Sequence, residues 1–126
     1  MRNCVYLHEI NKHYPIEITN LTLSINKNYY DADFPKFKNL KCFTELKKIR
    51  FEISHYPCNE DYLKINFNIL NSLKKLELIE ISISGIGLNF TKNKLDEKIG
   101  SELENVISIK YENDASYHYC IITRKN

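Results

Sequence analysis

The sequence predicts an α/β fold: a short right-handed solenoid of stacked repeats, with a parallel sheet on one side and short helices on the other. Three observations support this prediction. An apolar pattern, L-x-x-L-x-L in its simplest form, begins near residues 18, 46, 73 and 103 and so recurs every 27 to 30 residues. Segments with helical spacing separate the recurrences. A chain of 126 residues with 43% hydrophobic content is the right size to bury one core.

Each recurrence is expected to contain a short strand, because apolar residues two apart face the same side of a sheet. The first three strands direct these pairs toward the core: Leu21 with Leu23, Ile49 with Phe51, and Leu76 with Leu78. The fourth recurrence, within 103–109, contains one additional residue, which leaves its register open. Such units cannot bury their apolar edges alone, so stacked neighbours are expected to share one core.

Helices are expected between the strands. Apolar residues at every third position over 34–46 fit a short or tight helix. A polar cap at Asn59 precedes an apolar face running to Leu73, and Thr91 caps a third helix that Gly100 weakens. We therefore predict a single domain over 1–126, with an N-terminal cap (1–15), about four repeats (16–112) and a C-terminal cap (113–126), in which 117–123 forms a closing strand.

The repeats resemble the leucine-rich repeat family. The segment Ile18-x-x-Leu21-x-Leu23-x-x-Asn26 matches its pattern best, with Asn26 where the family uses an Asn side chain to bond the turning backbone. The equivalent positions in the next two repeats are Ser54 and Ile81, which depart from the family pattern. The resemblance covers residues 16–112 and implies an architecture, while it says little about function. This short, Ile-, Lys- and Asn-rich version also resembles the leucine-rich families multiplied in large AT-rich insect poxviruses.

Composition excludes several functional classes. The net charge of +2 provides no cationic field of the kind that neutralises nucleic-acid phosphates, so no nucleic-acid partner is expected. The longest charge-free apolar run, 81–90, is too short to span a bilayer, so no membrane association is expected. The N-terminus reaches His8 and Glu9 before any long apolar stretch, which is unlike a signal peptide. A cytoplasmic location is predicted, where four irregularly spaced cysteines stay reduced.

No motif predicts catalysis, a cofactor or a metal. Cysteine and histidine occur in three close pairs: Cys4/His8, His55/Cys58 and His118/Cys120. Two pairs could build a tetrahedral zinc site, but a solenoid would place the first and last pairs at opposite ends, so at most an adjacent pair could meet. The segment 85–87 lacks the remaining residues of a phosphate loop. The acidic pairs are expected on a solvated helix face with nearby lysines: Asp96/Glu97 and Glu102/Glu104.

The outward face of the repeat sheet is the predicted binding surface. Equivalent positions on adjacent strands form rows of mixed charge, as a protein-binding surface can. The predicted partner-binding residues are Lys48, Arg50, Glu52, Lys75, Glu77, Ile79, Ser108 and Lys110. We therefore predict a non-enzymatic module that binds a protein partner, and, where the poxvirus resemblance holds, a viral protein acting on host proteins in the host cytoplasm. The alternatives are a small enzyme with an unrecognised site in a loop, and a decayed repeat-family copy without a partner.

Overall fold

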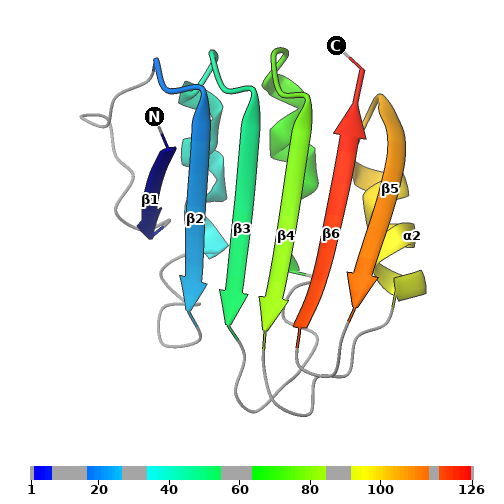
Figure 1. Cartoon of the computed structure of the whole chain (residues 1–126). Helices are drawn as coiled ribbons and strands as arrows, with labels where there is room; N and C mark the ends of the chain where they lie inside the picture. The colour runs from blue at the N-terminus through cyan, green and yellow to red at the C-terminus, as the bar shows by residue number, and fades with distance from the viewer. Residues whose placement is uncertain are drawn as a thin grey trace.

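Six strands among the described residues form one mixed β-sheet, and helices pack against one of its faces (Figure 1). The computed structural model describes residues 2–6, 17–26, 34–54, 64–84, 92–113 and 117–125. In spatial order the strands are β1 (Arg2–Tyr6), β2 (Asn20–Asn26), β3 (Lys48–Ser54), β4 (Leu78–Ser84), β6 (Tyr117–Arg124) and β5 (Val106–Asn113). On the covered face lie the 3₁₀ helices η3 (Phe34–Cys42) and η5 (Phe67–Ser72) and the α-helix α2 (Lys92–Glu102).

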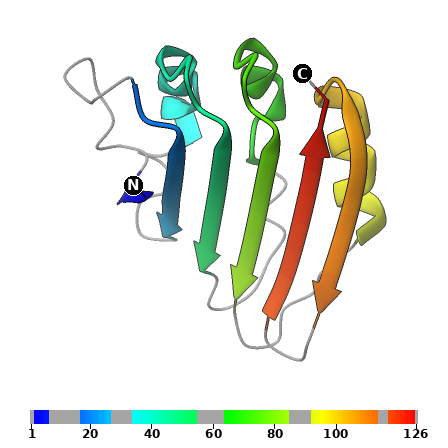
Figure 2. The same cartoon turned by 45° about the horizontal axis from the view of Figure 1, so that its top comes forward.

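Strands β1 to β4 are parallel and adjacent in sequence order. The recurring pattern predicts this arrangement for β2 to β4, whereas β1 lies in the segment predicted to be an N-terminal cap. Their register places Leu21 beside Ile49, and Ile49 beside Ile79. Parallel strands require a crossover of a dozen or more residues, and the helices η3 and η5 lie in these crossovers behind the sheet (Figure 2).

The second half of the sheet is antiparallel. Residues 106–113 do not pair with β4; β6 lies between β4 and β5 and is antiparallel to both. Only residues 114–116 separate β5 from β6 in sequence, a connection long enough for an antiparallel pair and too short for a parallel crossover. The predicted leucine-rich-repeat solenoid is therefore wrong. The chain forms an open, mixed α/β sheet, and the strand predicted to close one end of a stack is an interior strand of that sheet.

The core occupies the covered face. Alternate residues of β2, β3 and β4 point toward the helices, and each is at most 2% exposed. These residues are Leu21, Leu23, Ile25, Ile49, Phe51, Ile53, Ile79, Ile81 and Ile83. The helices contribute the opposing layer, which includes Phe37, Leu40, Phe67, Leu70, Leu95 and Ile99. Apolar residues with a period of two in the strands thus meet apolar residues from the helices, which is how a two-layer domain buries both elements.

The crossover from β2 to β3 and the crossover from β3 to β4 end in the same tight turn. The amides of Phe43 and Leu73 donate to carbonyls three residues earlier, at 3.2 and 3.1 Å, and those of Leu46 and Leu76 do likewise, each at 3.1 Å. Leu46 and Leu76 are therefore equivalent, and both are fully buried. The sequence prediction instead aligned Leu76 with Ile49, because both follow an L-x-x spacing in the recurring pattern and the same Lys-Lys doublet precedes both. That alignment is wrong by three residues, and Leu76 precedes β4 rather than lying in it.

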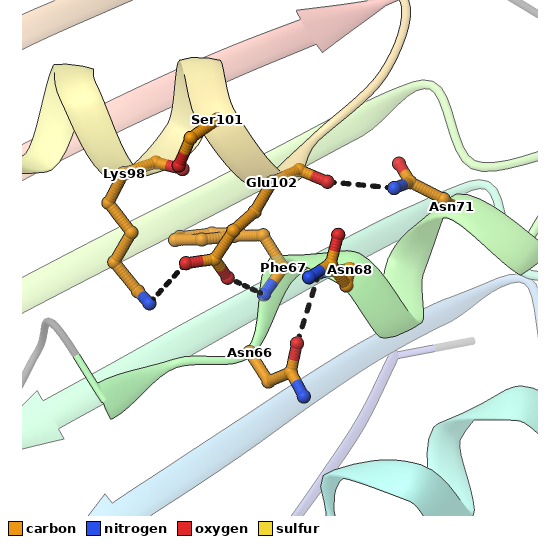
Figure 3. Close-up of polar contacts among 7 residues, drawn as sticks. All are labelled: Asn66, Phe67, Asn68, Asn71, Lys98, Ser101 and Glu102. Atoms are coloured by element: carbon orange, nitrogen blue, oxygen red, sulfur yellow. Dashed lines mark hydrogen bonds and ion pairs between the residues drawn. The ribbon is translucent and has the colours of Figure 1, made fainter.

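A polar joint fixes η5 to the C-terminal end of α2 (Figure 3). The Glu102 carboxylate accepts the backbone N–H of Phe67 at 3.1 Å and pairs with Lys98 Nζ at 2.5 Å. The Asn71 side chain donates to the Glu102 carbonyl at 2.8 Å and accepts the backbone N–H of Glu104 at 2.9 Å. The Phe67 N–H at the start of η5 and the Glu102 carbonyl at the end of α2 are helix-end groups, so the joint supplies a partner to each helix.

Arg124 closes the end of this layer from the last strand. Its side chain is 5% exposed, and its guanidinium donates to the carbonyls of Leu70, Leu73 and Leu76 at 3.2 to 3.4 Å and to that of Glu104 at 3.1 Å. Burial lowers the pKa of this guanidinium, although it stays positively charged at neutral pH. The side chain thus supplies donors to buried carbonyls of the crossover turn before β4.

Replacing Leu76 with alanine tests the importance of the buried turn. Leu76→Ala should reduce the free energy of unfolding by about 2–5 kcal/mol, since it removes a fully buried side chain and leaves a cavity. Glu77→Ala, at the exposed neighbouring position, should change it by less than about 0.5 kcal/mol. Urea denaturation of both variants measures the difference, and equal effects would contradict the assignment of Leu76 to the core.

Candidate interaction surface

The face of the sheet opposite the helices carries polar and aromatic side chains. We call it the open face, because η3, η5 and α2 all lie on the other side of the sheet (Figures 1 and 2). Side chains alternate along a strand, so the residues between the core positions point to this face. Its central members are Lys48, Arg50 and Glu52 of β3, Glu80 and Ser82 of β4, and Tyr117, Tyr119 and Ile121 of β6.

The Glu80 carboxylate is the centre of the open face. Its side chain is only 8% exposed, although no described helix covers it. One oxygen pairs with Lys48 Nζ at 2.9 Å and the other with Arg50 Nη1 at 3.0 Å. The Tyr119 hydroxyl also donates a hydrogen bond to this carboxylate. Glu80 therefore joins side chains of three adjacent strands, β3, β4 and β6.

Arg50 is held by three contacts. In addition to Glu80, its Nε pairs with Glu52 at 3.1 Å, and its guanidinium carbon lies 5.3 Å from the centre of the Tyr119 ring. The Tyr119 ring in turn stacks on Tyr117, with centroids 6.1 Å apart and planes inclined by 12°. A planar cation and two aromatic rings are thus packed together on the open face.

The charges of this cluster stabilise one another. Burial acts to raise the pKa of Glu80, but the hydrogen bonds from Lys48, Tyr119 and Arg50 outweigh it and hold that pKa below its ordinary value. The pKa of Tyr119 is raised, chiefly by burial and then by its hydrogen bond to the Glu80 carboxylate. At neutral pH the carboxylate is therefore ionised and the phenol protonated, which is the combination that the hydrogen bond needs.

Three of the predicted binding residues belong to this cluster. Lys48, Arg50 and Glu52 lie on β3 and point to the open face, as the alternation of that strand predicts. Ser108 and Lys110 also lie on this face, on β5, but β6 separates them from β4. The predicted rows ran directly from β4 to β5. They are interrupted by β6, which the prediction placed at the end of the stack as a closing strand.

The other three predicted residues lie elsewhere. Ile79 is fully buried in the core and pairs with Ile49 in the sheet, so its assignment to the binding surface is wrong. Lys75 and Glu77 are exposed but precede β4, and Lys75 pairs with Glu45 at 2.7 Å. All three errors have one cause, the three-residue misalignment of the third repeat.

The sequence predicts no role for Glu80 and places Tyr117 and Tyr119 in a closing strand, outside the predicted binding surface. Glu80 follows from the correct alignment, because it occupies the position of Arg50 one strand later. The alternation of Tyr117, Tyr119 and Ile121 was visible as a strand pattern, but nothing in one sequence shows that this strand pairs with β4. The two tyrosines therefore lie beside Glu80 and Arg50 only because β6 pairs with β4.

Other candidate sites have structural roles or lie outside the described residues. Among the residues that the structure describes, no group of three His, Cys, Asp or Glu side chains could hold a metal ion. Cys120 is buried beside Tyr111, whose hydroxyl donates to Asp96 at 2.5 Å and so ties β5 to α2. The Cys and His pairs at 4/8 and 55/58 and the 85–87 segment lie outside the described residues and side chains.

Comparisons with known proteins are sparse. No protein-family model matches this chain, and no curated protein matches its sequence. Among solved structures, it is similar to a protein in the NADB-Rossmann superfamily from Streptococcus agalactiae, with 9% sequence identity and a TM-score of 0.38. The match covers 99% of this chain and 62% of that chain, so the protein spans less than two thirds of that structure's length. Neither a leucine-rich repeat family nor a viral source is indicated.

Glu80→Gln tests whether the central carboxylate organises the open face. The amide keeps the shape but loses both ion pairs, so we expect a loss of about 1–3 kcal/mol of unfolding free energy at pH 7. Because the folded-state pKa of Glu80 is lowered, its contribution is present above the ordinary carboxyl pKa and is lost as pH falls through the folded-state pKa. Urea denaturation over a series of pH values from 7 downward should therefore show the stability difference between the two proteins narrowing once the pH falls below the ordinary carboxyl pKa. A difference that does not change with pH would contradict the charge-based account.

Thiol reactivity tests the placement of two cysteines. Cys42 is exposed, whereas Cys120 is buried and burial raises its pKa to about 12. Iodoacetamide at pH 8 should therefore alkylate Cys42 in the folded protein and leave Cys120 unmodified until denaturant is added. Peptide mapping by mass spectrometry distinguishes the two sites. Rapid alkylation of Cys120 without denaturant would show that β6 does not occupy the interior position described here.

Proposed function

We propose that the protein is a non-enzymatic interaction module that binds a protein partner through the open face of its sheet. One observation carries the proposal: Arg50, Tyr117 and Tyr119 are positioned together on a face that the described helices leave uncovered. Arginine and tyrosine dominate the energetically important positions of protein interfaces.

The network around Glu80 prepares the surface for binding. An arginine or tyrosine that is free to rotate loses conformational entropy when a partner fixes it. Here Arg50 is already held by Glu80 and Glu52, and Tyr119 by Glu80 and Tyr117. These side chains have therefore already lost most of their conformational entropy during folding, so little more is lost when a partner binds.

The charge pattern favours a protein partner over a nucleic acid. The described side chains of the open face include three basic ones, Lys48, Arg50 and Lys110, and three acidic ones, and two of the bases are paired with the central carboxylate. A balanced face of this kind cannot release counterions from a phosphate backbone efficiently. Aromatic rings surrounded by charges of both signs instead match the apolar centre and polar rim of a protein interface.

A cytoplasmic location is part of this proposal. Cys42 is exposed and free, and Cys120 is buried and free, which suits a reducing compartment. Within the described residues, no helix is long and apolar enough to cross a bilayer.

Affinity capture with surface variants tests the proposal. The immobilised protein, Tyr117→Ala and Arg50→Lys are compared against one lysate, and each captured protein is identified by mass spectrometry. Purified candidates are then measured by calorimetry. Both variants should weaken the binding of a true partner at least about tenfold, because one removes a stacked ring and the other removes the planar fork of Arg50.

The control variants lie on η3, on the other side of the sheet. Lys38→Ala and Lys41→Ala change exposed side chains there and should leave binding unchanged. Thermal unfolding confirms that every variant is folded. Binding that survives both open-face variants but is lost in the η3 variants would move the binding surface to the helical side and overturn the proposal.

A further inference from the structure

Of the strands that the structure describes, β5 lies at one end of the sheet. Among the described strands, β5 (Val106–Asn113) pairs only with β6. The other side of β5 therefore has no described strand to bond its backbone N–H and C=O groups (Figure 1). A free strand edge of this kind is a template for pairing with a further strand. Tyr111 of β5 is bonded to Asp96 of α2, so this edge is held against a helix before any pairing occurs.

We infer that β5 pairs antiparallel with β5 of a second copy of this chain, forming a two-fold symmetric dimer with one continuous sheet. The charge order of the strand carries this inference. Lys110 and Glu112 are exposed, two residues apart and on the open face, and no described residue forms an ion pair with either. A two-fold axis beside Tyr111 places Lys110 of each copy directly opposite Glu112 of the other.

Alternative registers are less favourable. An axis beside Lys110 would place two lysines opposite each other, and an axis beside Glu112 would do the same with two glutamates, and like charges directly opposite are destabilising. An axis beside Ile109 would require pairing through the β-bulge between Val106 and Ser108, where the strand is irregular. The register beside Tyr111 uses only the regular part of the strand and makes the opposite-charge contact twice.

The dimer is expected to be weak and reversible. About five residues of each strand, 109–113, pair in this register, and contacts of that size fall below the area of stable interfaces. The interaction is also sensitive to salt, since both ion pairs lie on an exposed face. It lies at the sheet edge and is independent of partner binding through Tyr117 and Arg50, so either can fail without the other.

Sedimentation equilibrium of the full chain, over a wide range of concentrations at low salt, tests this inference. The unmodified protein should show a monomer–dimer equilibrium. Lys110→Glu and Glu112→Lys should each weaken it at least about tenfold, because each replaces both attractive contacts by repulsive ones. The double variant, Lys110→Glu with Glu112→Lys, should restore it.

Mixing the two single variants gives the sharpest result. In a mixed dimer both contacts again join opposite charges, so an equimolar mixture should dimerise where neither variant does so alone. Lys41→Glu and Glu17→Lys, exposed charge reversals away from β5, are the controls and should leave dimerisation unchanged. Circular dichroism confirms folding in each case.

Three results would overturn the inference. The first is a monomer at every concentration reached. The second is single variants that dimerise as well as the unmodified protein, or a double variant and a mixture that do not regain dimerisation. The third is growth beyond the dimer, because pairing of β5 with the β1 edge of another copy would add subunits without closing.

Discussion

The buried carboxylate of Glu80 is the constraint on which the open face depends. A carboxylate that is 8% exposed must be paired, since an unpaired buried charge is strongly destabilising. Its partners come from three strands: Lys48 and Arg50 from β3 and Tyr119 from β6. The arrangement therefore requires β6 to lie beside β4. The core on the other face accepts any apolar strand at that position, whereas this network needs one that carries Tyr119.

Local features of the fold could be predicted from the sequence. Alternating apolar residues correctly predict β2 and β3, apolar residues at every third position predict the 3₁₀ helix η3, and a capped helical pattern predicts α2. These predictions succeed because each depends on residues close in sequence. The assignment of Lys48, Arg50 and Glu52 to one face succeeds for the same reason, since it needs only the period of a single strand.

Strand order and register could not be predicted in the same way. The Lys-Lys doublets before Ile49 and Leu76 suggested an alignment that the buried turns contradict, because exposed lysines place no constraint on register and buried apolar residues do. The regular spacing of the apolar pattern likewise suggested that a fourth parallel strand follows β4 in the sheet. The antiparallel β5–β6 pair ends the parallel series, and it brings Tyr117 and Tyr119 to the site from the end of the chain.

We propose that the face organised by Glu80 is the recognition surface, and amide chemical-shift mapping of the ¹⁵N-labelled protein with a purified partner tests this proposal. The largest shifts are expected on β3, β4 and β6, around Arg50, Glu80 and Tyr119. Shifts that cluster on η3, η5 and α2 instead, with those three amides unchanged, would contradict it.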